Sequence, residues 1–157
     1  MYKIEVCNPY FTFNDGDVIC VTTNGEIKKD GRAVMGAGNA KFARDNFPNV
    51  DLILAEFLTK YGNHVFILGK YQFNGKNVVL VSFPTKNSWR DKSDLNLIEQ
   101  SSRELLGLAN HFKLEKIYLP APGCSNGQLK WSDVKNKLSN LDDRFIVYSL
   151  DKETFDF

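Results

Sequence analysis

The fold is indicated most clearly by one stretch, Val18-Ile19-Cys20-Val21-Thr22-Thr23-Asn24-Gly25. Its first four residues are apolar without interruption, which is typical of a β-strand buried on both faces, and we predict a strand over Asp17–Thr22. The asparagine and glycine that follow favour a turn and begin a loop rich in glycine and charge that runs to Gly38. Connections between strands and helices usually span a few residues, so a loop of this length indicates function.

Strands and helices alternate over the rest of the chain, which predicts a layered α/β sheet. Asn74-Gly75 separates two apolar runs and is typical of a hairpin, so the sheet should be mixed. Further strands are expected at Tyr2–Cys7, His64–Phe73, Lys76–Phe83, Ile117–Leu119 and Phe145–Leu150, and helices at Ala40–Asn46, Val50–Tyr61, Ser93–His111 and Trp131–Leu141.

The composition is that of an ordinary globular protein. Its 157 residues, 43% of them hydrophobic, fit one domain. Twenty basic and 19 acidic side chains give a net charge of +1, which argues against a protein that coats duplex DNA with a basic face. A small nucleotide or a short single strand stays compatible with that charge.

The cysteines and the lengths of the apolar stretches indicate the cellular compartment in which the protein is expected. Cys7, Cys20 and Cys124 have neither paired nor zinc-type spacing, which favours a reducing cytoplasm. No apolar stretch approaches the ~20 residues that cross a bilayer, and the N-terminus lacks the apolar region of a signal peptide. We therefore expect a cytoplasmic monomer with no membrane contact, no metal and no cofactor.

Two loops at strand ends carry the candidate binding groups: Gly31–Ala40, which leads into a helix, and Pro120–Gly127, which lies between a strand and a helix. In sheets of this kind, ligands bind beyond the carboxyl ends of the strands. Small residues let the backbone approach a ligand, and a helix N-terminus favours anions. Two such loops at one edge suggest a diphosphate, although glycines can equally serve tight turns.

These stretches resemble the macrodomain family, which binds ADP-ribose, in the right order from about Tyr2 to Leu150. The matching stretches are Val21-Thr22-Thr23-Asn24-Gly25, Met35-Gly36-Ala37-Gly38-Asn39-Ala40, Phe47-Pro48 and Pro122-Gly123-Cys124-Ser125-Asn126-Gly127-Gln128-Leu129-Lys130-Trp131. The resemblance implies a three-layer α/β/α macrodomain with a six-stranded mixed sheet, formed by residues 1–157 as a single domain.

A further segment, Phe83-Pro84-Thr85-Lys86-Asn87-Ser88-Trp89-Arg90-Asp91-Lys92-Ser93, is similar to one in macrodomains that remove ADP-ribose from thymidine bases in DNA. Those macrodomains are the antitoxins of a DNA ADP-ribosylating toxin, and a related branch acts on protein carboxylates. In both branches a lysine of this segment is catalytic, and it corresponds to Lys86. An unprotonated amine could attack the anomeric carbon or its opened aldehyde, whereas an ammonium could protonate the leaving group. The sequence does not choose between these roles.

Three departures accompany the resemblance. Glu26–Arg32 is an apparent insertion, which puts the contacts to the far ribose in doubt and could form a lid, although its charged residues Lys28, Lys29 and Asp30 could simply be solvated. Ser125 stands where relatives usually have glycine. Gly127 stands where the protein-directed branch has a catalytic aspartate, which favours the DNA-directed branch.

The resemblance assigns Lys86 and Asn24 as catalytic, with Asn24 positioning the ribose or, alternatively, forming a turn. Asn8 is expected to read the adenine edge, although Asn-Pro is equally a turn signal. Trp89, with Arg90, could stack on a nucleobase of a single strand or pack against the next helix. The other expected substrate-binding residues are Met35, Gly36, Ala37, Gly38, Pro122, Gly123, Cys124, Ser125, Asn126 and Gly127.

The implied function is that of a hydrolase that removes ADP-ribose from a modified substrate, above all an ADP-ribosylated nucleobase in DNA. The alternatives are a phosphatase of ADP-ribose 1''-phosphate and a binding module for ADP-ribose or a related nucleotide without chemistry. Cys124 is interpreted as a small buried residue rather than a nucleophile, and Trp131 as core packing. The end of the chain, Asp151–Phe157, is expected to fray or dock weakly.

Overall fold

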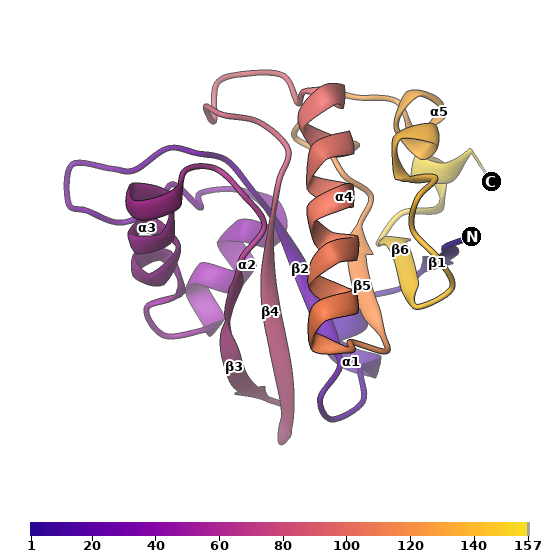
Figure 1. Ribbon diagram of the computed structural model, residues 1–157, viewed down its shortest axis with the longest axis horizontal. Helices are drawn as coiled ribbons and strands as arrows, with labels where there is room; N and C mark the ends of the chain where they lie inside the picture. The colour runs from indigo at the N-terminus through magenta and orange to yellow at the C-terminus, as the bar shows by residue number, and fades with distance from the viewer. Residues whose placement is uncertain (157) are drawn as a thin grey trace.

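The computed structural model describes residues 1–156 and has one six-stranded sheet with helices on both faces (Figure 1). The sheet order is β1-β6-β5-β2-β4-β3, and only β3, which pairs with β4, runs antiparallel. The strands are β1 (Lys3–Val6), β2 (Val18–Thr23), β3 (Ile67–Phe73), β4 (Lys76–Pro84), β5 (Ile117–Pro120) and β6 (Phe145–Ser149). The helices are α1 (Pro9–Thr12), α2 (Gly38–Asn46), α3 (Val50–Tyr61), α4 (Leu95–Phe112) and α5 (Trp131–Val134), with 3-10 turns η1 (Lys135–Leu138) and η2 (Lys152–Phe155).

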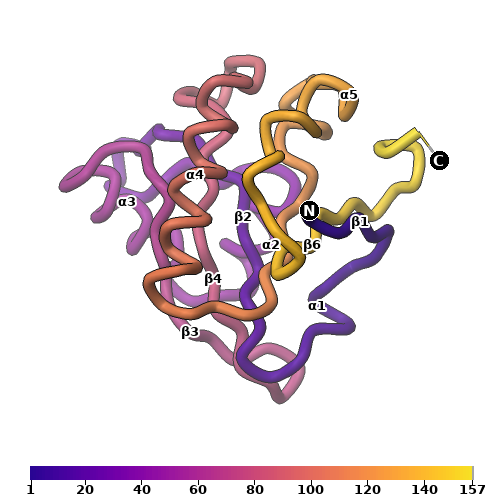
Figure 2. The backbone as a smooth tube through the Cα atoms, turned by 45° about the vertical axis from the view of Figure 1, so that its right-hand side comes forward, coloured from indigo at the N-terminus to yellow at the C-terminus, as the bar shows by residue number. Residues whose placement is uncertain are grey.

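The predicted three-layer α/β/α architecture with a mixed sheet is confirmed. Along β2, Val18 and Cys20 pack on the side of α4 and α5, whereas Ile19 and Val21 pack on the side of α1, α2 and α3. All four side chains are at most 2% exposed, as their unbroken apolar run predicts. Figures 1 and 2 show α4 on one face of the sheet and α2 on the other.

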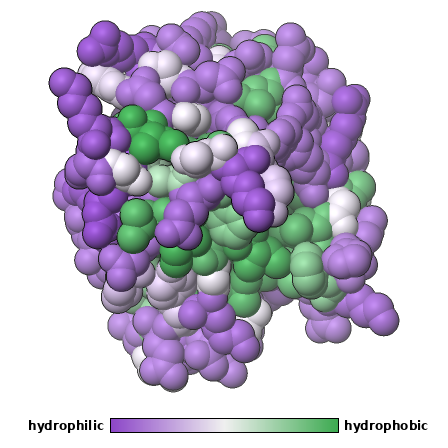
Figure 3. Space-filling view, turned by 60° about the vertical axis from the view of Figure 1, so that its left-hand side comes forward, coloured by the Kyte–Doolittle hydropathy of each residue, from purple (hydrophilic) through white to green (hydrophobic). Residues whose placement is uncertain are grey.

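The edge of the sheet at β3 carries a group of partly buried aromatic side chains. Phe57 of α3 and Phe66, just before β3, stack with ring centroids 4.7 Å apart. On the side of the molecule that carries α3 and β3, Figure 3 shows hydrophobic residues gathered in the middle of a mainly hydrophilic surface. These rings close the core at its edge and lie on elements that do not form the cavity described below.

The predicted helix Trp131–Leu141 is wrong in its second half. The α-helix ends at Val134 and continues as η1. The reason is tertiary hydrogen bonding to α4: Ser102 Oγ donates to the carbonyl of Lys137 at 3.1 Å, and Asn140 Nδ2 donates to the carbonyl of Ser102 at 3.1 Å. These bonds compete with helical bonds that the sequence pattern alone would favour.

Most other boundaries differ from the sequence prediction by one or two residues, and two differences are larger. The strand predicted from His64 begins at Ile67, because Glu104 of α4 accepts the backbone N–H of Val65 at 2.9 Å and Ser82 Oγ accepts that of Phe66 at 3.0 Å. Helix α1 was not predicted, and the side chain of Asn8 caps it by accepting the backbone N–H of Tyr10 at 3.2 Å.

The end of the chain docks rather than frays over its described part. Phe155 of η2 is 5% exposed, and its ring meets that of Trp131 edge-on, with centroids 5.0 Å apart. The rest of the expectation for this segment falls on Phe157, which lies outside the described residues. The two ends of the chain lie on the same side of the molecule (Figures 1 and 2). Within residues 1–156 no helix has the length and apolar character needed to span a membrane.

Candidate functional site

A cavity of about 1030 Å³ opens at the carboxyl ends of the parallel strands β2, β4, β5 and β6. This is the edge where a sheet of this type is expected to bind ligands. Every residue that the sequence assigned to the site lines this cavity, except Pro122. Pro122 is buried instead, and its carbonyl accepts a weak bond from the Cys124 thiol at 3.5 Å.

The end of β2 brings Asn24 to the cavity and also gives it the role of a turn residue. Its side chain is 9% exposed. Oδ1 accepts the backbone N–H of Glu26 at 3.0 Å, and Nδ2 donates to the carbonyl of Val34 at 3.4 Å. Asn24 therefore holds the first loop in place while lining the cavity, so the two interpretations of this residue are compatible.

The first loop enters α2 with its backbone facing the cavity. Asn39 ties the first turn of α2 to β2, because its Oδ1 accepts the N–H of Thr22 and its Nδ2 donates to Thr22 Oγ1, both at 2.8 Å. Ala37, at the N-cap, provides no side-chain hydrogen bond to the free N–H groups of this helix. A side chain at Gly36 would meet no protein atom within 4 Å. The helix therefore presents unpaired backbone donors beside open space.

The second loop is packed far more tightly. Gly123 has φ +73°, and a Cβ atom there would lie 2.8 Å from Leu129 and 2.9 Å from Ser93 Cβ. A Cβ atom at Gly127 would overlap Ser93 Oγ and lie 2.7 Å from Gly123 Cα. Any side chain at 127, an aspartate included, is therefore excluded by the neighbouring backbone. Burial raises the pKa of the Cys124 thiol to about 11, which agrees with its interpretation as unreactive.

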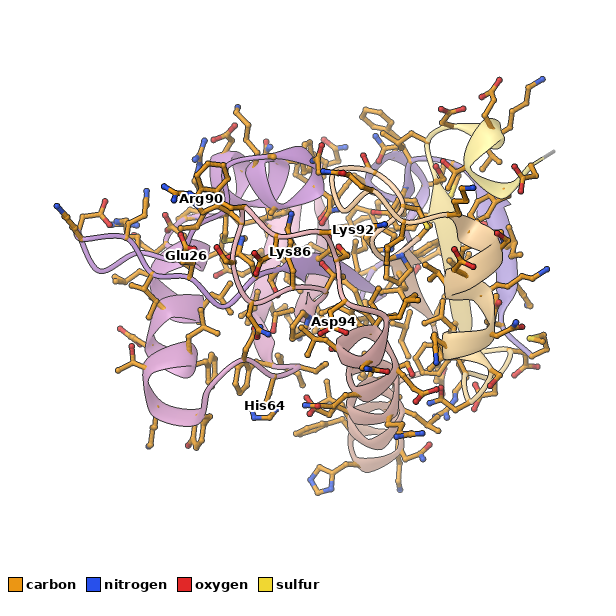
Figure 4. All side chains as sticks on the ribbon, turned by 90° about the horizontal axis from the view of Figure 1, so that it is seen from above. Glu26, His64, Lys86, Arg90, Lys92 and Asp94 are labelled. Atoms are coloured by element: carbon orange, nitrogen blue, oxygen red, sulfur yellow. The ribbon has the colours of Figure 1, made fainter. Side chains whose placement is uncertain are left out.

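Lys86 follows β4 in a segment that is fixed at both ends. Thr85 donates its N–H to the carbonyl of Thr23 at 3.0 Å, and Asp94 donates its N–H to the carbonyl of Thr85 at 2.9 Å. Lys86 is half-buried, and its Nζ donates to the carbonyl of Trp89 at 3.3 Å. Seen from above the cavity, Lys86 lies between Arg90 and Glu26 on one side and Lys92 on the other (Figure 4). Among the residues described, Lys86 is the one basic side chain that lines the cavity.

Asn63 supports this segment and was missed by the sequence prediction. Its Nδ2 donates to the carbonyl of Lys86 at 3.1 Å and to Asn87 Oδ1 at 3.0 Å. The turn that carries Asn63 is held by Glu104, which lies 2.9 Å from His64 Nδ1. Burial acts to raise the pKa of Glu104, but hydrogen bonds from the Val65 N–H, Gln100 and His64 outweigh it and lower that pKa. No local sequence signal links these segments.

The inserted segment Glu26–Arg32 does not cover the cavity, and none of its residues lines it. It extends toward α3 (Figure 1), where Arg32 Nη1 binds Asp51 Oδ1 at 2.8 Å. Lys28 and Asp30 are exposed, as the solvated interpretation of this segment predicts. The lid alternative is wrong, and the insertion leaves the loop from Val34 onward in contact with the cavity.

Trp89 remains at the mouth of the cavity. It is 51% exposed, and the guanidinium carbon of Arg90 lies 5.2 Å from its ring centroid. Trp131, by contrast, is 7% exposed and packs on Tyr2 and Phe155, which confirms its assignment to the core.

The opposite end of the cavity contains residues that the sequence did not indicate. Asn8 lines it together with Tyr10, Tyr148, Asp151 and Thr154. Asp151 is the one acidic lining residue among those described, and its Oδ1 accepts the N–H of Glu153 at 3.0 Å. Asp151 and Thr154 were missed because they belong to the segment expected to fray or dock weakly.

Buried hydroxyls without protein partners are concentrated in this cavity. Tyr10, Thr23 and Ser93 line it, each at most 6% exposed, and no described protein group bonds to their hydroxyl oxygens. Such groups are costly unless a ligand or solvent meets them. Among the described residues, no group of three or more His, Cys, Asp or Glu side chains is arranged to hold a metal ion.

Comparison with known proteins identifies related sequences and folds. A family model described as "Macro domain" matches residues 49–138. A protein of Mycobacterium tuberculosis named DNA ADP-ribosyl glycohydrolase is 26% identical over 132 residues, which cover 81% of this chain and 37% of that protein. The chain thus spans little more than a third of the length of this relative.

Solved structures with the same fold include the macrodomain of Mycobacterium tuberculosis DarG, with a TM-score of 0.74 and 23% identity over 94% of this chain and 97% of that one. Another is Thermosipho africanus DarTG in complex with ADP-ribose, with a TM-score of 0.73 and 21% identity over 94% of this chain and 41% of that one.

Proposed function

Since the chain belongs to the Macro domain family, we propose that its cavity binds ADP-ribose and that it hydrolyses the bond between ADP-ribose and a nucleobase in DNA. The observation that carries this proposal is the position of Lys86, the sole basic residue lining the cavity among those described, at the end of β4 beside the second loop. The relatives named DNA ADP-ribosyl glycohydrolase support the choice of DNA.

Backbone groups, rather than a cluster of basic side chains, would neutralise the diphosphate. The uncapped N-terminus of α2 and the loop from Gly123 to Gly127 both face the cavity. Helix N-termini and successive loop N–H groups bind phosphate well. A cavity of about 1030 Å³ has room for a ligand of this size. The ligand would then extend from Asn8 and Asp151 at one end to Lys86 at the other.

The reaction breaks the bond between the base nitrogen and C1'' of the distal ribose, and water supplies a hydroxyl to C1'' and a proton to the base. As an amine, Lys86 Nζ would attack C1'', and the base would depart with a proton from the amine. The resulting bond between Nζ and C1'' would open to an imine, which water hydrolyses to free ADP-ribose and the lysine amine. As an ammonium, it would protonate the departing base. Asn24 would orient the ribose from the end of β2.

Trp89 and Arg90 support a nucleobase substrate. The indole of Trp89 is exposed, the Arg90 guanidinium lies over its ring at 5.2 Å from the centroid, and Lys86 Nζ donates to the Trp89 carbonyl. Such pairs stack on bases of single-stranded nucleic acid without sequence preference. A base that carries ADP-ribose must leave the duplex stack to be reached.

The test compares Lys86→Ala with Lys92→Ala, a lysine of the same segment that does not line the cavity. Release of ADP-ribose from a modified single-stranded oligonucleotide should fall about 10²–10⁴-fold in Lys86→Ala. Calorimetric affinity for ADP-ribose should persist in this variant, and Lys92→Ala should match the wild type. Full turnover by Lys86→Ala would refute the role of this lysine.

Two further assays separate the alternatives. Phosphate release from ADP-ribose 1''-phosphate, with no action on the oligonucleotide, would support a phosphatase. Binding without turnover of either substrate would support a binding module. Treatment with cyanoborohydride during turnover should trap a covalent adduct on Lys86 if an imine forms, and should trap nothing if Lys86 acts only as an acid.

A further inference from the structure

Ser93 is buried beside the cavity with a hydroxyl that the protein does not use. It is 6% exposed, it lines the cavity, and no described protein group bonds to its Oγ. Other buried serines of the same region have partners: Ser101 Oγ donates to the carbonyl of Pro84 at 2.7 Å. An unpaired buried hydroxyl costs free energy, and a ligand that bonds to it would remove that cost.

The position of Ser93 defines which part of a ligand it would meet. Its N–H donates to the carbonyl of Gly127 at 3.0 Å, and its side chain lies against both Gly123 and Gly127. The next residue, Asp94, donates its N–H to the carbonyl of Thr85, directly before Lys86. Ser93 therefore lies where the second loop meets the segment of Lys86.

We infer that Ser93 Oγ is a substrate-binding group that hydrogen-bonds to the ligand where its second phosphate joins the distal ribose. This inference rests on the proposed function, because it assumes that the second loop holds the diphosphate and that Lys86 acts at the distal ribose. Ser93 Oγ occupies the space that a side chain at Gly127 would need. The hydroxyl therefore depends on glycine at position 127.

A hydroxyl of this kind has a distinctive signature on mutation. Removing an unsatisfied buried hydroxyl takes away no protein hydrogen bond, so stability should be unchanged or higher in Ser93→Ala. Removing its bond to the ligand should weaken binding. A serine that only supports the loop would show the reverse: lower stability and little specific effect on affinity.

The experiment measures calorimetric affinity for ADP-ribose, ADP and AMP together with thermal unfolding, for the wild type, Ser93→Ala and the control Ser101→Ala. Ser93→Ala should bind ADP-ribose about five- to tenfold more weakly, bind AMP as the wild type does, and unfold at the same or a higher temperature. Ser101→Ala should unfold at a lower temperature with unchanged affinities. The ADP titration locates the contact on the phosphate if ADP is weakened, and on the ribose if it is not.

Wild-type affinity of Ser93→Ala for ADP-ribose, or an equal loss for AMP, would overturn the inference and leave the proposed function standing. A wild-type protein that binds none of the ligands would overturn both. Should Ser93→Ala unfold at a lower temperature, Ser93→Cys preserves the side-chain volume with a much weaker donor. The same selective loss of ADP-ribose affinity is then expected, and its absence counts against the inference.

Discussion

In the loop from Gly123 to Gly127 the protein leaves no room for a side chain at either glycine, whereas in the loop from Val34 to Gly38 the space beside Gly36 is open. The glycines of the second loop meet Ser93, Leu129 and each other. A Cβ atom at Gly36 would meet no protein atom within 4 Å, and the φ of Gly36 lies outside the left-handed region. Packing therefore explains the two glycines of the second loop. In the first loop Gly38 has φ +56° and a Cβ atom there would lie 3.0 Å from Asn126 Nδ2, so only Gly36 is left without a reason inside the protein.

The largest effect that tests this comparison is expected for Gly127→Ala. The added methyl group would overlap Ser93 Oγ and crowd the backbone of Gly123, which cannot easily move. The free energy of unfolding in urea should fall by about 2–3 kcal/mol. Gly107→Ala is the matched control, because Gly107 is an exposed position of α4 with open space around it, and this variant should be more stable by about 0.5–1 kcal/mol. A Gly127→Ala protein as stable as the wild type would contradict the packing explanation.

Gly36→Ala, in contrast to Gly127→Ala, should leave stability intact and weaken ligand binding. Nothing in the protein opposes the methyl group, so the free energy of unfolding should stay the same or rise by about 0.5 kcal/mol. Affinity for ADP-ribose, measured by calorimetry, should fall about tenfold, or about 1.4 kcal/mol, because the methyl group fills space that the ligand needs. Unchanged affinity would show that the ligand does not approach this part of the first loop.

Arg32→Ala tests whether the inserted segment Glu26–Arg32, called the inserted arm below, takes part in binding. Loss of the bond to Asp51, which is 5% exposed, should lower the free energy of unfolding by about 1 kcal/mol. ADP-ribose affinity should remain within about twofold of the wild type, a change of about 0.4 kcal/mol, since the arm does not line the cavity. Lys28→Ala, which removes an exposed pair with Asp30 at 3.7 Å, should have no measurable effect on either quantity. A large loss of affinity in Arg32→Ala would indicate that the arm reaches the ligand.

Elements whose signals are local were predicted well. Helix α3 has the predicted bounds Val50–Tyr61, because Pro48 and Gly62 mark its ends in the sequence itself. The hairpin between β3 and β4 turns at Asn74-Gly75, as that dipeptide indicates. The region after Trp131 was predicted poorly, since its bonds to Ser102 join segments far apart in the chain.

For the site, glycine content and strand ends were enough to predict that the two loops meet at one edge of the sheet, whereas Lys86 was assigned by the resemblance of its segment to the family. They were not enough to identify Pro122 as buried, or to find Asn63 and Asp151. Pro122 belongs to the second loop but is buried, and the amino-acid composition of a loop does not indicate which of its residues are buried. Asn63 acts on Lys86 from a turn between α3 and β3, with no sequence pattern that joins them.

The sequence by itself determined the order of the strands and of the helices other than α1, the double-sided burial of β2 and the edge of the sheet where the cavity forms. These features follow from side-chain periodicity and from turn residues, which act over a few neighbouring positions. Only the tertiary structure decided that Ser93 lies against Gly127, that Asn63 supports Lys86, and that the inserted arm binds α3 and leaves the cavity open. Close packing and hydrogen bonds between distant segments depend on distances that no local pattern specifies.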